Sequence, residues 1–338
     1  MAVQNLQNEK KIVLDYLNDV DNCKNEDLAN VISNHTSENF HMRCTHPFNE
    51  IKGPKNVANQ LWLPIRDSFK PIQRRLDIFY AGINSLEENP GVWISSMGHL
   101  MGVFNKSFFG LQPNYKSSLL RFAEFYKVED NKITEGAIFL DIFNFMQQLA
   151  LSFIPESTGL VCVTPGPMNH KGLKFELSDN GESIKTLDLI HRMRDRLVKG
   201  SKMKSFKEEL ELDWKKDMIW WGPGGIGASY TIDGYIRGHT NPFEEGLEFV
   251  KFNGHVLSSA EDDLGGWFGW PNLIMKSKGG YLGLTSHSDI ESEMRVVDLY
   301  RRDGNKIAEN WIFIDHLHFL KLLGIDLLEI NKRKKCPK

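Results

Sequence analysis

The chain contains an internal repeat, because the segment 121–149 recurs 174 residues later as the segment 295–323. The first copy reads RFAEFYKVEDNKITEGAIFLDIFNFMQQL and the second reads RVVDLYRRDGNKIAENWIFIDHLHFLKLL, and the two align without a gap. Eleven of the 29 positions are identical: Arg121/Arg295, Tyr126/Tyr300, Asn131/Asn305, Lys132/Lys306, Ile133/Ile307, Glu135/Glu309, Ile138/Ile312, Phe139/Phe313, Asp141/Asp315, Phe145/Phe319 and Leu149/Leu323. Such repetition predicts a fold that builds one structural unit twice.

Each copy has the pattern of a strand, a tight turn, a second strand and a short helix. In the first copy, residues 121–128 and 133–140 are rich in aromatic and β-branched residues and flank a four-residue turn. In the second copy the turn contains Asp303-Gly304, which is a strong hairpin signal. After the shared aspartate, apolar residues lie four apart, as they do in helices. The aspartate is therefore expected where a strand gives way to a helix.

The strand that ends each copy is apolar on both faces. In the second copy, one face carries Glu309, Trp311, Phe313 and Asp315, and the other carries Asn310, Ile312 and Ile314. The first copy repeats this alternation, with Phe139 and Asp141 on one face. We expect one face to pack on helices and the other on a second sheet, which is most simply the sheet of the other copy.

The same residues carry a family resemblance. The run Gly304-Asn305-Lys306-Ile307-Ala308-Glu309-Asn310-Trp311, with Asp315 and then Leu322-Leu323-Gly324, resembles the SnoaL-like polyketide cyclases of the NTF2-like superfamily. The first copy keeps much of this motif but has Ala137 at the position of the tryptophan. Residues 98–104 and 109–113 resemble the family's third strand and the following turn, of which the second copy retains only residues 281–284. The resemblance implies an α+β fold with two tandem modules, each a curved sheet wrapped around helices as a cone-shaped α+β barrel with an apolar pocket.

The resemblance also implies roles for the aspartates. In catalytic relatives the matching aspartate is the general acid/base at the pocket floor, which makes Asp141 and Asp315 the candidate catalytic residues. Apolar neighbours, Phe139 in one copy and Trp311 with Phe313 in the other, would raise the pKa of such a carboxyl by desolvation. The alternative is that each aspartate caps a helix, as aspartates at strand–helix boundaries often do.

Histidine and arginine side chains supply candidate polar partners for the first aspartate. His41 and Arg43 lie on the expected first strand, and His99 lies on the third. They could hold a carbonyl or enolate oxygen while the aspartate moves a proton, or they could be ordinary hydrogen-bonded strand residues. His316 and His318 are spaced so that they point in different directions, and we expect no metal site there.

A glycine-rich run, Gly222 to Gly227, matches the pattern GxGxxG. The βαβ context of a dinucleotide-binding site is missing, because residues 228–232 do not start a helix. We expect instead a loop at the mouth of a pocket. Trp220 and Trp221, which precede it, are expected to form either aromatic pocket wall or core.

Composition limits the partners of the chain. Its 338 residues carry a net charge of −3, which gives no general attraction for nucleic acid or anionic membrane. The four cysteines, Cys23, Cys44, Cys162 and Cys336, are scattered and predict a reducing compartment. No apolar run reaches about 18 residues, so we expect a cytoplasmic protein without a cofactor.

We therefore predict one module over residues 1–152, a linker rich in proline and glycine over 153–182, and a second module over 183–338. The modules would form a covalent pseudo-dimer that is monomeric or pairs again as a homodimer. The predicted function is proton-transfer catalysis of the aldol cyclase or isomerase type on a small, apolar carbonyl compound. The alternative is a non-catalytic protein that binds a small ligand or has a structural role.

Overall fold

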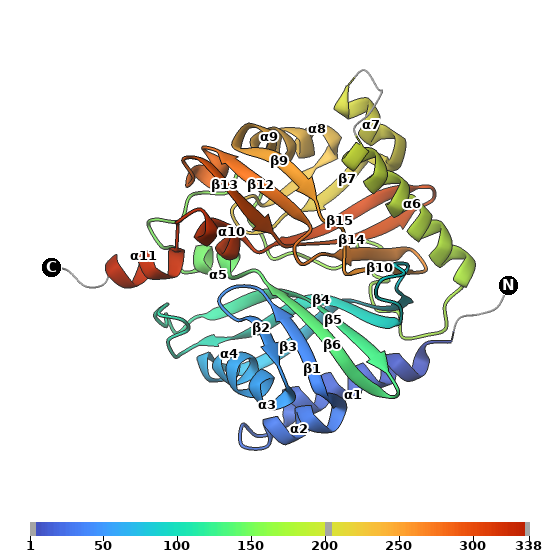
Figure 1. Cartoon of the computed structure of the whole chain (residues 1–338), viewed down its shortest axis with the longest axis vertical. Coiled ribbons are helices and arrows are strands. Elements are labelled where there is room, and N and C mark those ends of the chain that lie inside the picture. Colours follow the sequence, from blue (N-terminus) through green and yellow to red (C-terminus); the bar gives the residue numbers. More distant parts are fainter. Residues whose placement is uncertain (1–4, 200–204, 335–338) are drawn as a thin grey trace.

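The computed structural model describes residues 5–199 and 205–334 and contains two stacked six-stranded sheets with helices on their outer sides (Figure 1). The first half consists of α1 (Gln7–Asn22), α2 (Leu28–His35), β1 (Thr36–Cys44), β2 (Asn49–Lys52), α3 (Pro54–Val57), the π-helical turn η1 (Ala58–Trp62), α4 (Leu63–Ser68), β3 (Phe69–Ile83), β4 (Val92–Phe104), β5 (Ser117–Glu129), β6 (Lys132–Leu140) and α5 (Ile142–Gln148). Cys336 lies outside the described residues.

The second half repeats this order with more interruptions. It consists of α6 (Asn180–Lys199), α7 (Phe206–Asp213), β7 (Trp214–Trp221), β8 (Ala228–Tyr230), α8 (Thr231–Tyr235), η2 (Ile236–Thr240), α9 (Asn241–Gly246), β9 (Leu247–Phe252), β10 (Leu257–Glu261), β11 (Leu264–Phe268), β12 (Leu273–Lys278), the short turn η3 (Tyr281–Gly283), β13 (His287–Met294), β14 (Val296–Asp303), β15 (Lys306–Ile314), α10 (His316–Leu322) and α11 (Leu327–Lys334).

The two large sheets have the same strand order, as the repeat predicts. The first is β2-β1-β6-β5-β4-β3, and the second is β8-β7-β15-β14-β11-β10. In each, the first long strand pairs in parallel with the last, β1 with β6 and β7 with β15. The sheets are curved, and among the described residues their end strands do not pair with each other, so neither sheet closes into a barrel.

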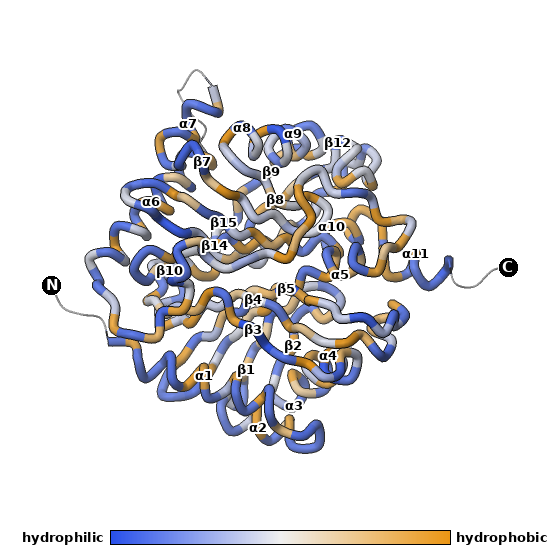
Figure 2. The backbone as a smooth tube through the Cα atoms, turned by 180° about the vertical axis from the view of Figure 1, so that it is seen from behind, coloured by the Kyte–Doolittle hydropathy of each residue, from blue (hydrophilic) through white to orange (hydrophobic). Residues whose placement is uncertain are grey.

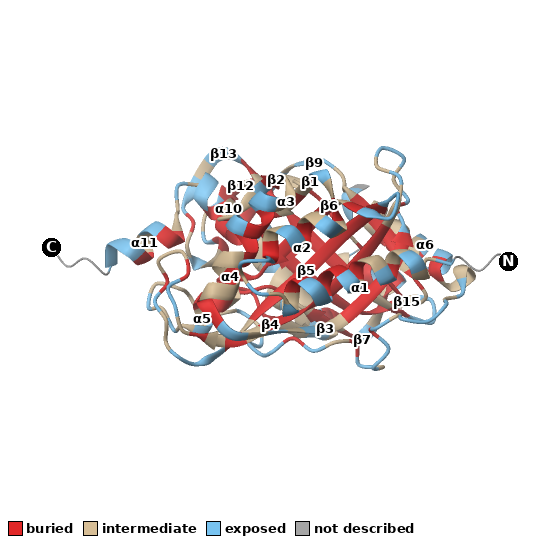
Figure 3. Cartoon of the chain, turned by 90° about the horizontal axis from the view of Figure 1, so that it is seen from below, coloured by how far each residue is buried: buried red, intermediate tan, exposed pale blue. Residues whose placement is uncertain are grey.

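Three apolar cores separate these layers. One lies between the first sheet and its helices and also takes in leucines of α10 and α11, one lies between the second sheet and its helices, and the third lies between the two sheets. The predicted alternation of the last strand is confirmed, because Ile312 and Ile314 belong to the helix-side core while Trp311 and Phe313 belong to the core between the sheets. Figure 2 shows this apolar interior, and Figure 3 shows buried strands beneath helices whose outer sides are exposed.

The second half departs from the first where three long strands are interrupted. Strands β3, β4 and β5 are continuous over 15, 13 and 13 residues. Their counterparts break into β9 and β10, β11 and β12, and β13 and β14, and the outer pieces form a separate sheet of order β13-β12-β9. Asn272 holds this break, because its Oδ1 accepts a hydrogen bond from Val296 N (2.7 Å) and its Nδ2 lies 3.1 Å from His255 Nδ1.

The segment between α5 and α6 pairs with a strand of each large sheet. Leu160 forms an antiparallel bridge with Ala228 of β8, and Leu173 forms a parallel bridge with Phe79 of β3. These contacts pair part of one edge strand of each sheet, where backbone groups would otherwise be unpaired. Within residues 5–199 and 205–334, none of the helices combines the length and apolar character needed to cross a membrane.

Candidate functional site

Asp141 caps helix α5 and also binds the other half of the molecule. Its Oδ1 accepts a hydrogen bond from Asn144 N (3.0 Å), and its Oδ2 accepts one from Gly224 N (2.9 Å). Gly224 lies so close to α5 that an added Cβ would be 2.3 Å from Asn144 N. Close approach to helix α5 therefore explains why the glycine-rich run needs a glycine at this position.

Asp315 makes the reciprocal contact. Its Oδ1 accepts a hydrogen bond from His318 N (3.2 Å) as the cap of α10, and its Oδ2 accepts one from His46 N of the first half (2.9 Å). Burial raises the pKa of Asp315 to about 6, although Arg295 at 3.3 Å opposes the rise. The two repeated aspartates thus exchange hydrogen bonds across the interface, each with the loop that follows the first strand of the other half.

The repeated arginines lie beside these aspartates. Arg121 is 3.5 Å from Asp141, its guanidinium lies 4.0 Å from the centre of the Phe313 ring, and it donates to Ile312 O (3.1 Å). Arg295 lies 4.0 Å from the Trp270 ring and donates to Asn49 Oδ1 of the first half (3.2 Å). Burial lowers the pKa of Arg121 to about 10, which still leaves it charged at neutral pH.

The other residues predicted for a catalytic pocket do not gather around Asp141. His41 pairs with Glu50 (3.0 Å), Arg43 pairs with Glu135 (2.8 Å), and His99 pairs with Asp77 (3.1 Å). The aromatic candidates Phe139, Trp311 and Phe313 fill the core between the sheets, and Trp221 packs against it. Only Trp220 faces the helices of the second half, where its ring stacks on His239 with centroids 4.3 Å apart.

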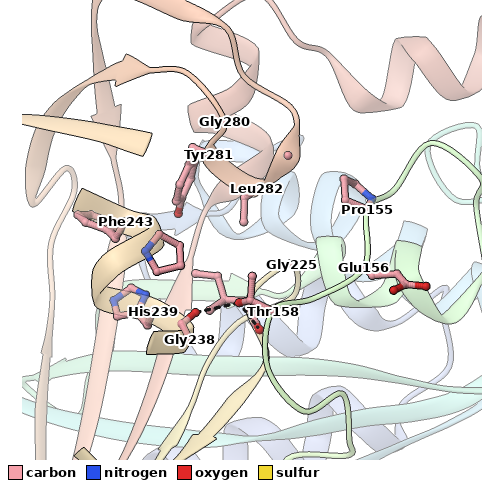
Figure 4. A pocket seen from close by; sticks show the side chains of 13 residues that line it. Pro155, Glu156, Thr158, Gly225, Gly238, His239, Phe243, Gly280, Tyr281 and Leu282 are labelled. Carbon is pink, nitrogen blue, oxygen red and sulfur yellow. Dashed lines mark hydrogen bonds between the residues drawn. The ribbon is translucent and has the colours of Figure 1, made fainter. Parts of the chain in front are cut away.

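A cavity of about 240 Å³ opens in the second half beside these rings. Its walls come from η2 and α9, from the η3 turn, from the glycine-rich loop and from the linker (Figure 4). The lining residues are Pro155, Glu156, Thr158, Gly225, Ile226, Gly238, His239, Pro242, Phe243, Gly280, Tyr281, Leu282 and Gly283. The glycine-rich loop thus borders a pocket, and neither Asp141 nor Asp315 is among the described residues that line it.

The buried histidines and the tyrosine at this cavity are uncharged at neutral pH. His239 has a buried Nδ1 that has no hydrogen-bond partner among the described residues, and burial lowers its pKa to about 3. Tyr281 places its hydroxyl 3.0 Å from His316 Nε2. Burial also lowers the pKa of His316 to about 3 and raises the pKa of Tyr281. The site therefore offers hydrogen-bonding groups on an apolar wall.

Comparison of the two copies reveals what sequence reasoning missed. His239 is the fourth residue of η2, and the fourth residue of η1 is Leu61. His316 begins α10, whereas Ile142 begins α5. Tyr281 packs on Phe319 with ring centroids 5.9 Å apart. In the first half, Phe108 packs in the same way on Phe145, with ring centroids 6.3 Å apart. The histidines and the tyrosine hydroxyl are thus confined to the second half, a signal that lay in the differences between the copies.

A second missed feature is a carboxyl group on the helix side of each large sheet. Asp298 accepts a hydrogen bond from Asn310 Nδ2 (2.8 Å), and burial raises its pKa to about 8. The repeat aligns it with Glu124, which pairs instead with Arg74 at 2.6 Å. No group of three or more His, Cys, Asp or Glu side chains in the described part of the chain is arranged to hold a metal ion.

Comparison with known proteins gives matches among solved structures alone. No family model and no curated protein matches the chain. A SnoaL-like protein of Jannaschia sp. CCS1, described as a polyketide cyclase, is 14% identical, with 44% of this chain and 94% of that chain covered and a TM-score of 0.35. An NTF2-like protein of Burkholderia xenovorans LB400 is 13% identical, with 42% and 97% covered and a TM-score of 0.33.

An LEH-like epoxide hydrolase of M. tuberculosis is 12% identical, with 42% of this chain and 90% of that chain covered and a TM-score of 0.30. Each of these proteins is matched over nearly its whole length by less than half of this chain. SnoaL-like and NTF2-like proteins are the groups that the sequence motif resembles. The chain is thus similar to SnoaL-like polyketide cyclases and NTF2-like proteins over less than half of its length.

Proposed function

We propose that this chain binds a small, uncharged and largely apolar compound that carries a carbonyl or hydroxyl oxygen, in the cavity of its second half. The observation that carries the proposal is His239, which lines the cavity and whose buried Nδ1 has no hydrogen-bond partner among the described residues. A buried polar atom without a hydrogen bond costs on the order of 1–3 kcal/mol. A ligand that supplies the missing hydrogen bond would recover part of that cost.

The charge and surface of the cavity support this ligand class. Ile226, Phe243 and Leu282 supply apolar wall, and the described lining residues include no lysine or arginine to bind an anion. Glu156 at the rim disfavours a carboxylate further. The neutral imidazole of His239 can donate or accept one hydrogen bond without a net charge on the ligand.

Replacing His239 with the leucine of the first copy tests the proposal. We expect His239→Leu to weaken binding of α-tetralone, a bicyclic apolar ketone, by about tenfold, because one net hydrogen bond is lost. Binding of tetralin, which lacks the oxygen, should change little. Calorimetric titration of both compounds measures this, and 1-naphthoate serves as the anionic comparison. Equal losses for ketone and hydrocarbon, or tighter binding of the carboxylate, would refute the proposed ligand class.

A second candidate function is proton transfer on a bound carbonyl compound, of the aldol cyclase or isomerase type. The favouring observation is the Tyr281–His316 pair, since Tyr281 lines the cavity and burial keeps its phenol protonated. A protonated phenol can stabilise an oxyanion that develops on the ligand. In this proposal Tyr281, whose hydroxyl bonds to His316, stabilises the enolate oxygen while the α-proton passes to a water or hydroxide that enters the cavity, and Asp141 and Asp315 join the halves.

Exchange of the α-protons of α-tetralone for deuterium tests this second candidate. If the wild type accelerates exchange, Tyr281→Phe should lower the rate by about 10²-fold, because one oxyanion donor is lost. Ligand affinity should change much less. NMR in deuterated buffer follows the exchange, with His41→Gln as a control at a histidine outside the cavity. No acceleration by the wild type would leave binding alone as the function.

A further inference from the structure

The cavity lies in the second half, but one side chain of the first half holds two of its walls. Gln147 of α5 accepts a hydrogen bond from Gly225 N at its Oε1 (3.2 Å). Its Nε2 donates to Ser157 Oγ (3.0 Å) and Pro155 O (3.4 Å). Gly225 and Pro155 line the cavity (Figure 4), whereas Gln147 is not among the described residues that line it.

The rest of α5 supports the same wall. An added Cβ on Gly225 would lie 3.0 Å from Phe143 of α5 and 3.0 Å from Leu282, so this loop is tightly packed between the helix and the cavity. Phe143 also meets the His316 ring edge-on at 5.7 Å. Helix α5 of the first half thus backs both the glycine-rich loop and the histidine that holds Tyr281.

Among the residues that the structure describes, the second copy has no contact that matches those of Gln147. Lys321 occupies the matching position in α10, and its Nζ pairs with Asp326 of its own half at 3.0 Å. The aspartate contacts, by comparison, are made in both directions. The contacts of Gln147 thus run in one direction, from the first half to the half that contains the cavity. The histidines and the tyrosine of the cavity also occur in that half alone.

We propose that Gln147 is a positioning residue for ligand binding. By bonding to both the glycine-rich loop and the linker, it holds two neighbouring walls of the cavity in place. The ligand site is therefore built by both halves of the chain, and the second half by itself does not complete it. This inference rests on the proposed binding function.

The adjacent residue provides a matched control. Gln148 has the same side chain on the same helix, but it bonds within the first half, to Leu119 N (3.1 Å) and Leu119 O (2.8 Å). We expect Gln147→Ala to weaken binding of α-tetralone about tenfold, since it removes up to three hydrogen bonds of modest net value. Gln148→Ala should leave the affinity within about twofold. Gln147→Glu can still accept from Gly225 N and from the Ser157 hydroxyl but loses the bond to Pro155 O, so it should fall between them.

Amide hydrogen exchange in the unliganded protein supplies a readout that needs no ligand. Exchange over residues 222–228 and 155–158 should accelerate in Gln147→Ala and stay unchanged in Gln148→Ala. If the wild type binds α-tetralone and both alanine variants bind it equally well, or lose affinity equally, the positioning role is overturned. If the wild type binds none of the probes, the proposed function fails. The exchange data then still decide whether Gln147 holds the two walls, because unchanged exchange in Gln147→Ala would show that it does not.

Discussion

Replacing Trp311 with alanine is expected to lower the free energy of unfolding by about 3–5 kcal/mol. Trp311 is fully buried between the two sheets, and its Nε1 donates a hydrogen bond to Pro165 O at 2.9 Å. Truncation would leave a large cavity in the core that joins the halves, and the carbonyl of Pro165 would lose its partner. Urea unfolding of the whole chain measures the loss.

An exposed aromatic residue provides the control for that experiment. Phe249 is 53% exposed on β9, and Phe249→Ala should change the free energy of unfolding by no more than about 0.5 kcal/mol. A loss for Trp311→Ala below about 1 kcal/mol would show that the sheets do not pack face to face. A biphasic unfolding curve in the variant would indicate that the halves separate before they unfold.

The second large effect is expected at Asp315. Asp315→Ala should destabilise the protein by about 3–5 kcal/mol, because it leaves Arg295 buried without its carboxylate and frees the N–H groups of His46 and His318. Asp326 is the matched control, since it caps α11 by accepting from Glu329 N (3.1 Å) at a more exposed position. Asp326→Ala should cost about 1 kcal/mol, which is typical of a helix cap, because the partly exposed ion pair of Asp326 with Lys321 adds little. Equal losses in the free energy of unfolding at both positions would show that Asp315 acts only as a helix cap.

Asp315 also predicts a dependence on pH. Burial raises its pKa from 3.8 to about 6 in the folded chain, so the folded state binds this proton more tightly than the unfolded state does. The part of its stabilisation that comes from binding this proton is therefore full below pH 3.8 and is lost as the pH rises through about 6. The free energy of unfolding of the wild type, minus that of Asp315→Asn, should fall over this window. A difference that rises with pH would contradict the raised pKa.

Much of the fold follows from the sequence because the decisive patterns are local. The repeat of 121–149 predicts two sheets of equal strand order, and the alternation around Trp311 predicts which side of a strand meets the other sheet. The interruption of three strands in the second half was not predictable in this way. It depends on tertiary contacts such as those of Asn272, which link residues far apart in the chain.

The candidate site was less accessible to sequence reasoning. Asp315 bonds to His46, 269 residues away, and no local pattern distinguishes such a contact from a catalytic role. The motif drew attention to the identities between the copies, whereas the cavity depends on their differences, at His239, Tyr281 and His316. Phe139 and Phe313 were expected in a pocket wall. They lie instead in the core between the sheets, because the strand face that carries them is covered by the other sheet.

The most direct test of the account is a crystal structure of the full chain soaked with 7-bromo-α-tetralone, in which anomalous scattering locates the bromine. We predict a single strong peak in the cavity of the second half, with the ketone oxygen within hydrogen-bond distance of His239 or Tyr281. A peak beside Asp141 or Asp315, or in the interior of the first half, would contradict the account, because the ligand would then occupy a place that we assign to packing.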